Sequence, residues 1–255
     1  MTPELIQRTL AGLVLILIAA LELWLGGNAL WVLATIIGLI MIREWARLTG
    51  GMDQRRLGQY ALCLPLGLLS PLAAGPGPVS ALGFLVALLI ILIVSRNLWF
   101  SAGVIYVGMP VTALLWLRMQ EDGLMLSFWA LSLVWATDIG AYFAGRTFGG
   151  PKIAPKISPN KTWSGLIGGM LGALLLAGIL VVDAGLSPRL AWASPALALL
   201  AQIGDFFESW MKRRAGVKDS GTLIPGHGGA LDRLDGVVPA LPAAALLVWL
   251  GLQAG

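Results

Sequence analysis

Residues 79–95 read VSALGFLVALLIILIVS and contain no charged side chain. A membrane-spanning helix needs about 20 consecutive, mostly apolar residues. This run provides most of them, and Arg96 and Asn97 follow it directly. The stretch therefore predicts a transmembrane helix, and it sets the class of the whole fold.

The composition agrees with a membrane protein. Of the 255 residues, 58% are hydrophobic and only 12% are charged, whereas about 25% are charged in soluble domains. The formal net charge of +4 arises from 17 Lys and Arg set against 13 Asp and Glu. These figures exclude a soluble globular domain, a disordered tail and a nucleic-acid-binding protein. The single cysteine excludes a disulfide framework within the chain.

Eight further apolar stretches are separated by Gly, Pro or charged residues. The chain is predicted to be an all-α, polytopic membrane helix bundle of about nine transmembrane helices. About five spans lie in residues 1–122, and residues 123–255 form the predicted catalytic region. The predicted spans are 5–24, 29–48, 57–73, 79–95, 98–117, 123–145, 163–182, 190–211 and 235–253.

The basic residues predict the orientation of this bundle. With a cytoplasmic amino terminus, every Lys and Arg except Arg118 and Arg189 falls on the inner side, as the positive-inside rule requires. The two longest polar connections, residues 146–162 and 212–234, then face the cytoplasm. Nucleotides and other phosphorylated metabolites are found on that side.

Ionisable side chains within a membrane are costly, so each is a candidate functional residue. Four acidic residues of the predicted spans stand out: Glu22, Asp138, Asp205 and Glu208. Glu22 lies near the outer end of its span, where a side chain reaches the interface at little cost. Asp138 lies about two helical turns before the basic loop. It either takes part in the site or pairs with a nearby Lys or Arg.

Residues 204–236 read GDFFESWMKRRAGVKDSGTLIPGHGGALDRLDG and are the part of the chain richest in such side chains. If the helix continues to about residue 213, spacings of three, four and seven place four polar side chains on one face: Asp205, Glu208, Ser209 and Lys212. Asp232 and Asp235 are again three apart, where the last predicted span begins. We expect the two carboxylate pairs to converge.

Converging carboxylates beside Lys and Arg side chains are typical of a site for a metal-bound polyphosphate. Mg²⁺ prefers oxygen ligands and is held by one or two carboxylates together with substrate phosphates, while basic side chains bind the phosphate oxygens. The alternative is an internal network of salt bridges that binds no ligand.

The glycines of PGHGG, residues 225–229, give the backbone unusual freedom. Successive glycines allow N–H groups to converge on an anion, although glycines also occur in ordinary turns. His227 is the only histidine, and its neighbours favour a phosphate contact over a purely structural role. A general base is not required, because a phosphate group has a second pKa of about 6.

The other polar loop combines lysines with prolines at 151, 155 and 159, which exclude a regular helix. Its lysines are Lys152, Lys156 and Lys161. Short polar side chains precede the next predicted span, where a helix amino terminus favours anions: Ser158, Asn160 and Thr162. The loop either binds an anionic substrate or is an ordinary positive-inside loop.

In these two loops the chain resembles the CDP-diacylglycerol synthase, or phosphatidate cytidylyltransferase, family. SWMKR at 209–213, KD at 218–219, PGHGG at 225–229 and DRLD at 232–235 fit the family signature in order and spacing. SPNKTW at 158–163 is similar to its second conserved loop. Two positions differ from the family pattern: Ala230 replaces a larger aliphatic residue, and Ser164 replaces an acidic one. The resemblance extends from Asp138 onwards.

The resemblance implies that CTP and phosphatidic acid react to give CDP-diacylglycerol and pyrophosphate, with Mg²⁺ and optionally a second cation as cofactor. The metal ligands predicted on this basis are Asp205, Asp232, Asp235 and Glu208. The predicted catalytic residues are Asp205, Asp232, Lys218 and His227. Substrate binding is assigned to Lys212, Arg213, Arg233, Ser158, Asn160, Lys161, Thr162, Ser209 and Asp138.

Two other functions remain open from the sequence. Another CTP-dependent lipid enzyme, a polyprenol kinase or an ether-lipid cytidylyltransferase, would differ in its products. A cation-coupled secondary transporter would use Asp138, Asp205 and Glu208 as a relay and would leave the Gly-His-Gly-Gly loop unexplained.

The expected partners are CTP, phosphatidic acid and membrane lipids, with no nucleic acid. The expected location is a bacterial inner (plasma) membrane, with the active site facing the cytoplasm. Small residues in the span 163–182 allow close helix packing, either within the bundle or across a homodimer: Gly165, Gly168, Gly169 and Gly172.

Overall fold

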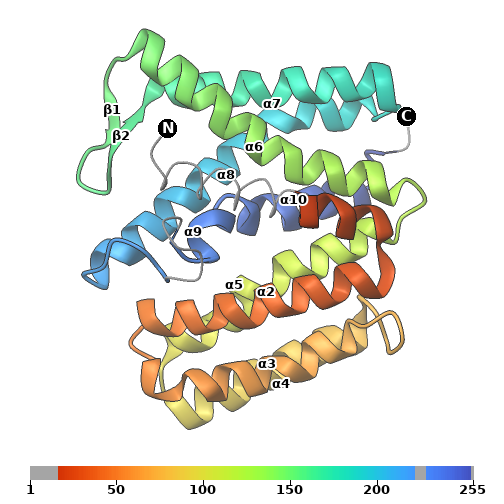
Figure 1. Cartoon of the computed structure of the whole chain (residues 1–255), viewed down its shortest axis with the longest axis vertical. Helices are drawn as coiled ribbons and strands as arrows, with labels where there is room; N and C mark the ends of the chain where they lie inside the picture. Colours follow the sequence, from red (N-terminus) through yellow and green to blue (C-terminus); the bar gives the residue numbers. More distant parts are fainter. Residues whose placement is uncertain (1–16, 222–227, 254–255) are drawn as a thin grey trace. The chain divides into compact units, whose positions relative to one another are not determined.

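The computed structural model describes residues 17–221 and 228–253 (Figure 1). The chain divides into two compact units, which we describe separately. Unit 1 comprises Met1–Leu115 and Ala215–Arg233, and unit 2 comprises Trp116–Arg214 and Leu234–Gly255.

Unit 1 contains the first helices of the chain. Residues 17–25 are helical, and in Figure 1 the helices α2, α3 and α4 run side by side, coloured orange to yellow. Pro78 is the first residue of α4, where its missing N–H group costs nothing. The elements are α2 (Gly27–Leu48), the 3₁₀-helix η1 (Met52–Gln54), α3 (Arg55–Leu68), α4 (Pro78–Ser95) and most of α5 (Leu98–Arg118).

Trp45 of α2 lies at the centre of the core of unit 1. Its side chain is 2% exposed, and its ring stacks on Tyr106 of α5 with 4.5 Å between the centroids. The indole N–H donates a hydrogen bond of 2.7 Å to the Trp99 carbonyl. A Cβ on Gly103 would lie 2.3 Å from the Trp45 ring, so this close approach requires glycine. The packing of Trp45 fixes the neighbouring residue, Glu44.

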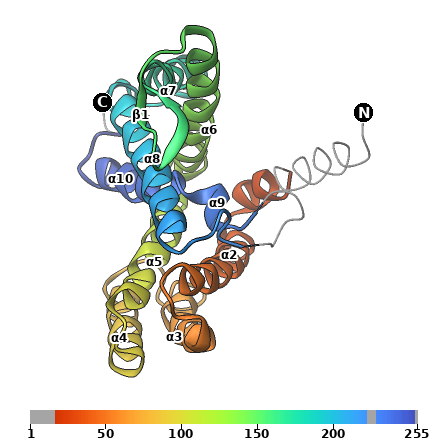
Figure 2. The same ribbon diagram turned by 90° about the vertical axis from the view of Figure 1, so that its left-hand side faces the viewer.

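Unit 2 contains a helical bundle and a small β-hairpin. Figure 1 shows α6 and α7 side by side with the hairpin at one end, and Figure 2 shows the same hairpin turned toward the viewer. The short helix α9 (Leu231–Leu234) crosses from unit 1 into unit 2. The other elements are α6 (Gly123–Phe148), β1 (Lys152–Ala154), β2 (Ser158–Thr162), α7 (Trp163–Ala184), α8 (Pro188–Arg214) and α10 (Val237–Trp249).

The glycines of α7 pack against α6 within the chain. A Cβ on Gly168 would lie 2.2 Å from the Ala144 Cβ, and one on Gly172 would lie 2.7 Å from the Ala136 carbonyl oxygen. On the facing helix, a Cβ on Gly140 would lie 2.4 Å from the Gly168 carbonyl oxygen. Of the two alternatives for this small-residue face, the structure shows packing within the bundle.

Among the described residues, six helices are long and apolar enough to cross a membrane: α2, α4, α5, α6, α7 and α8. Their bounds agree with six predicted spans to within a few residues. Two others are shorter than predicted: α3 has 14 residues, ending before Ser70 and Pro71, and α10 has 13, beginning after a turn. The first predicted span, 5–24, lies largely outside the described residues. The chain is thus a mostly helical membrane protein, and the count of nine is not confirmed.

The all-α prediction missed the hairpin. β1 and β2 pair antiparallel, with Lys152 opposite Thr162 and Ala154 opposite Ser158. The prolines exclude a helix here, as predicted, but the fixed φ of proline is compatible with extended chain at a sheet edge. The second polar loop is therefore an ordered ribbon leading into α7.

Candidate functional site

In unit 2, α8 continues to Arg214 and places the predicted polar side chains on one face, as the spacing indicated. The Ser209 hydroxyl donates to Asp205 Oδ1 at 3.3 Å. Lys212 Nζ lies 3.5 Å from Glu208 Oε1, and Glu208 is buried. On this face of α8, each acidic side chain thus lies beside a hydroxyl or ammonium group.

Lys161, at the end of the hairpin, contacts the acidic face of α8. Its ammonium forms a salt bridge with Asp205 Oδ2 and lies 4.7 Å from the centroid of the Phe206 ring. A predicted substrate-binding lysine therefore neutralises a predicted metal ligand. The contact joins the hairpin to the polar face of α8.

Two more predicted acids lie beside Asp205. Asp138 of α6 is close enough to interact electrostatically with both Asp205 and Lys161. Asp235 lies in the turn between α9 and α10, outside the six candidate spans. A Cβ on Gly204 would lie 2.3 Å from the Asp235 carbonyl oxygen, so glycine permits this close approach of α8. Burial, reinforced by the Asp205 carboxylate, raises the pKa of Asp235 to about 7.

In unit 1, hydrogen-bond donors surround Asp232. Its Oδ2 accepts a bond of 2.8 Å from the Ser220 N–H, one of 2.9 Å from the Ser220 hydroxyl and one of 2.8 Å from the Gly229 N–H. A carboxylate that accepts several hydrogen bonds is stabilised in its charged form. The surrounding backbone therefore fixes the position of this predicted metal ligand.

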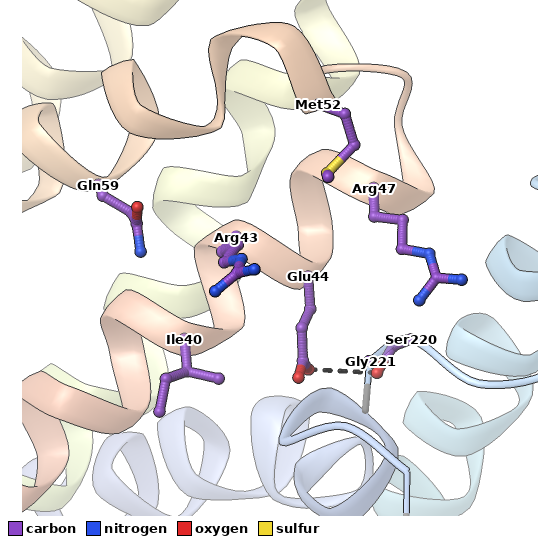
Figure 3. Close-up of a pocket in the computed structure, with 8 residues that line it drawn as sticks. All are labelled: Ile40, Arg43, Glu44, Arg47, Met52, Gln59, Ser220 and Gly221. Carbon is purple, nitrogen blue, oxygen red and sulfur yellow. Dashed lines mark hydrogen bonds between the residues drawn. The ribbon is translucent and has the colours of Figure 1, made fainter. Parts of the chain in front are cut away.

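A second carboxylate, Glu44 of α2, binds the same segment and was not predicted from the sequence. It is 6% exposed. Its oxygens accept bonds of 3.0 Å from the Ala230 N–H and 2.8 Å from the Leu231 N–H. The Ser220 hydroxyl lies 3.2 Å from Glu44 Oε2, the contact dashed in Figure 3. One hydroxyl carries one proton, so Ser220 donates to Glu44 or to Asp232, not to both at once.

Two glycines of this segment are required by the close approach of the Glu44 carboxylate. A Cβ on Gly221 would lie 2.2 Å from Glu44 Oε1, and one on Gly229 would lie 2.6 Å from either Glu44 oxygen and 2.4 Å from Ser220 Oγ. The N–H groups of residues 229–231 converge on the side-chain carboxylates of Asp232 and Glu44. The predicted contact of the PGHGG glycines with a phosphate stays a prediction, because most of that motif lies outside the described residues.

One feature of the sequence does point to Glu44. It lies inside the predicted span 29–48, next to the buried Trp45. The arginines at 43 and 47 made this end of the span look like an ordinary charged boundary. Treating every acid within a span as a candidate would have found it.

The hairpin residues have separate roles. The Thr162 hydroxyl accepts a bond of 3.1 Å from the Gly165 N–H and caps α7. The Ser164 hydroxyl, at one of the positions that differ from the family pattern, donates to the Gly149 carbonyl. Ser158 and Asn160 lie on β2, where Asn160 is exposed.

The remaining predicted residues are less constrained. Arg213, Lys218 and Arg233 are exposed, and His227 lies outside the described residues. Across residues 17–221 and 228–253, no three His, Cys, Asp or Glu side chains are grouped so as to hold a metal ion by themselves. Asp232 belongs to unit 1, while Asp205 belongs to unit 2. Their predicted convergence therefore stays a prediction.

Comparison with known proteins agrees with the signature. Residues 6–250 match the model of the cytidylyltransferase family. A phosphatidate cytidylyltransferase of Brucella suis biovar 1 is 42% identical over 255 residues, covering 96% of this chain and 92% of the relative. One from Haemophilus influenzae is 46% identical over 128 residues, covering 47% of this chain and 44% of the relative. The similarity to the Brucella protein includes the amino-terminal spans, so the whole chain belongs to the cytidylyltransferase family.

Proposed function

We propose that the chain transfers a cytidylyl group from CTP to phosphatidate, forming CDP-diacylglycerol and releasing pyrophosphate. The observation that carries this proposal is a cytidylyltransferase signature whose acids lie among basic side chains at one end of membrane helices. One substrate is a membrane lipid and the other a water-soluble nucleotide, and a site at the end of a span is accessible to both. The relatives named phosphatidate cytidylyltransferase favour this reaction over the alternatives.

The carboxylates in each unit fit a hard divalent cation. In unit 2, Asp205 and Asp235 lie close enough that Asp205 raises the pKa of Asp235, a repulsion that a bound cation would relieve. We assign Mg²⁺ to Asp205 and Asp232, with Asp235 and Glu208 as further ligands and a second cation as an option. Two carboxylates per ion, completed by substrate phosphates, are typical of Mg²⁺ sites. The bound ion would neutralise negative charge on the triphosphate.

The other residues of the chain bind and orient the substrates. Basic side chains in the last turn of α8 and in the segment after it hold phosphate oxygens, and the hairpin covers the nucleotide or the lipid headgroup. In the reaction, a phosphate oxygen of phosphatidate forms a bond to the α-phosphorus of CTP while the bond to pyrophosphate breaks in line. The assigned phosphate-binding residues are Lys212, Arg213, Lys218, His227 and Arg233, and the hairpin and helix contacts are Ser158, Asn160, Lys161, Thr162, Ser209 and Asp138.

The predicted catalytic region, residues 123–255, contains all of these residues, and Glu44 adds one from the amino-terminal part of the chain. The basic residues favour an orientation with these loops in the cytoplasm, in a bacterial inner membrane. Cysteine replacement of Lys218 and Arg189, followed by labelling with a membrane-impermeant reagent, tests the orientation. Of the two introduced cysteines, only the one at position 189 should react in intact cells.

The reaction itself is tested with detergent-purified protein, CTP, Mg²⁺ and phosphatidate. Pyrophosphate and the mass of the lipid product are followed together, and a reaction without Mg²⁺ is the control. CDP-diacylglycerol should appear in equal amount with pyrophosphate.

Other products would identify the alternatives. A phosphorylated lipid alcohol together with CDP would indicate a kinase with the same nucleotide site. Folded protein that consumes no CTP with any lipid acceptor, but moves a solute into sealed vesicles, would replace the proposal by transport.

A further inference from the structure

A pocket of about 470 Å³ lies in unit 1 beside the carboxyl-terminal half of α2. Figure 3 shows its lining, with the Ser220–Gly221 segment facing the helix. We propose that this pocket binds the phosphate group of a substrate, with two arginines as its donors. This inference rests on the proposed function. The lining residues are Ile40, Arg43, Glu44, Arg47, Met52, Gln59, Ser220 and Gly221.

The two arginines lie on one face of α2. Arg43 and Arg47 are four positions apart, one helical turn, so their side chains are neighbours. Both are exposed. Among the described residues, neither guanidinium has an Asp or Glu oxygen within 4.0 Å. The pocket therefore has positive charge without an acidic partner in the described chain.

Glu44 lies between these arginines but points elsewhere. Its oxygens accept hydrogen bonds from the Ala230 and Leu231 N–H groups, and the Ser220 hydroxyl lies 3.2 Å from its Oε2. Figure 3 shows its carboxylate directed at Ser220. The one acid in the lining is thus bound to the neighbouring segment and does not form an ion pair with either arginine.

A phosphate group fits this arrangement. The planar guanidinium presents a fork of donors that matches two phosphate oxygens, and such charge-assisted bonds are stronger than neutral ones. Gln59 and Ser220 add polar groups, while Ile40 and Met52 give an apolar wall. The phosphate could come from phosphatidate or from the polyphosphate of CTP, because both present the same oxygens.

The pocket lies next to the predicted catalytic machinery. Ser220 lines the pocket, and its N–H donates a hydrogen bond to Asp232. Ser220 would thus be a common neighbour of a phosphate bound at the arginines and of Asp232, a proposed metal ligand. This position suits a group that must be held near the reacting atoms.

The other explanation is that these arginines only follow the positive-inside rule. Arg55 and Arg56 at the start of α3 provide an internal comparison. They belong to the same charged boundary, but neither lines the pocket. Arg55 donates to the Met52 carbonyl at 3.0 Å, and Arg56 is exposed. A topological role would make Arg56 equivalent to the pocket arginines.

The test compares Arg43→Ala/Arg47→Ala with the matched control Arg56→Ala. The Michaelis constants for phosphatidate and for CTP are measured separately on purified protein. Loss of two charge-assisted contacts should raise one of them at least about tenfold, and Arg56→Ala should stay within about twofold of wild type. A raised KM for phosphatidate assigns the pocket to the lipid, and one for CTP assigns it to the nucleotide.

A second variant keeps the test decisive if the double alanine protein does not fold. Arg43→Lys/Arg47→Lys retains the charge but loses the fork of donors, so its KM should lie between those of wild type and the alanine variant. Wild-type Michaelis constants for both substrates in either folded variant, with normal turnover, would overturn the pocket and leave the proposed function intact.

A binding measurement that needs no turnover distinguishes a failure of the phosphate pocket from a failure of the proposed reaction. Dioctanoyl phosphatidate and magnesium pyrophosphate are each added to the purified protein, and the midpoint of thermal unfolding is measured. At least one of them should raise the midpoint of wild type and of Arg56→Ala, but not of the double alanine variant. Stabilised wild-type protein that makes no CDP-lipid would contradict the proposed function and keep the pocket. Stabilisation of the alanine variant equal to wild type would contradict the pocket.

Discussion

The two carboxylate regions of the protein are held in different ways. In unit 1, Asp232 and Glu44 accept hydrogen bonds from backbone N–H groups of residues 229–231 and from Ser220. In unit 2, Asp205 pairs with the ammonium of Lys161, and Glu208 lies near that of Lys212. Neutral backbone donors stabilise the first region, and flexible cations stabilise the second.

This difference separates a rigid region from an adjustable one. Backbone donors cannot move away without refolding the loop, so Asp232 keeps its place whether or not substrate is bound. A lysine side chain has several rotatable bonds, so Lys161 can transfer from Asp205 to a substrate phosphate. Substitutions in unit 1 should therefore affect folding and activity together, and those at Lys161 should affect activity more than folding.

The largest effect is expected from removing a proposed metal ligand. Asp232→Asn and Asp205→Asn should each lower kcat at least about a hundredfold, because a charge that stabilises the reacting phosphates is lost. The thermal unfolding midpoint and pyrophosphate release are measured on the same preparation. Glu121→Gln, which changes an exposed acid in the turn before α6, is the control. Full activity in either aspartate variant would remove that residue from the metal site.

A smaller but still large effect is expected from Gly229→Ala. The new Cβ would lie within 2.6 Å of both Glu44 oxygens and 2.4 Å from Ser220 Oγ, so the loop must shift. We expect a loss of about 1–3 kcal/mol in unfolding free energy and activity at least about tenfold lower. Gly67→Ala in α3, where a Cβ meets nothing within 4 Å, should be neutral or slightly stabilising. Equal behaviour of the two variants would show that the loop is not held tightly.

Glu44→Gln should weaken the same loop without creating a clash. One carboxylate oxygen becomes an amide group, so an N–H of Ala230 or Leu231 loses its acceptor, at a cost of about 1–3 kcal/mol. Hydrogen exchange of these two amides should accelerate, while exchange in α7 stays as in wild type. Unchanged exchange at both amides would contradict the role assigned to Glu44.

The smallest effect on stability is expected from Lys161→Gln. The pair with Asp205 is partly exposed, so its loss should cost only about 0.2–1 kcal/mol. Turnover should fall more than this stability change explains, since the lysine is also assigned to substrate. If Lys161→Gln lowered the free energy of unfolding as much as Glu44→Gln does, the carboxylates of unit 2 would be held as rigidly as those of unit 1.

Much of the fold could be predicted because lipid-spanning helices need long apolar runs. The spans at 79–95 and 163–182 correspond closely to α4 and α7. Helix periodicity likewise placed Asp205 and Glu208 on one face. The hairpin was missed because prolines exclude a helix without specifying what replaces it. The Glu44 contact was missed because it joins residues 44 and 231, and no local pattern records such a pairing.

Central to the proposed function is the assignment of Asp205 and Asp232 as ligands of a metal ion that binds together with the nucleotide. The most direct test uses Mn²⁺ as a paramagnetic probe and measures its binding to purified protein with and without a non-reacting CTP analogue. We predict that the analogue strengthens Mn²⁺ binding to wild type and to Glu121→Gln, and that Asp205→Asn and Asp232→Asn each abolish this gain. Nucleotide-dependent Mn²⁺ binding that persists unchanged in both aspartate variants would contradict the account.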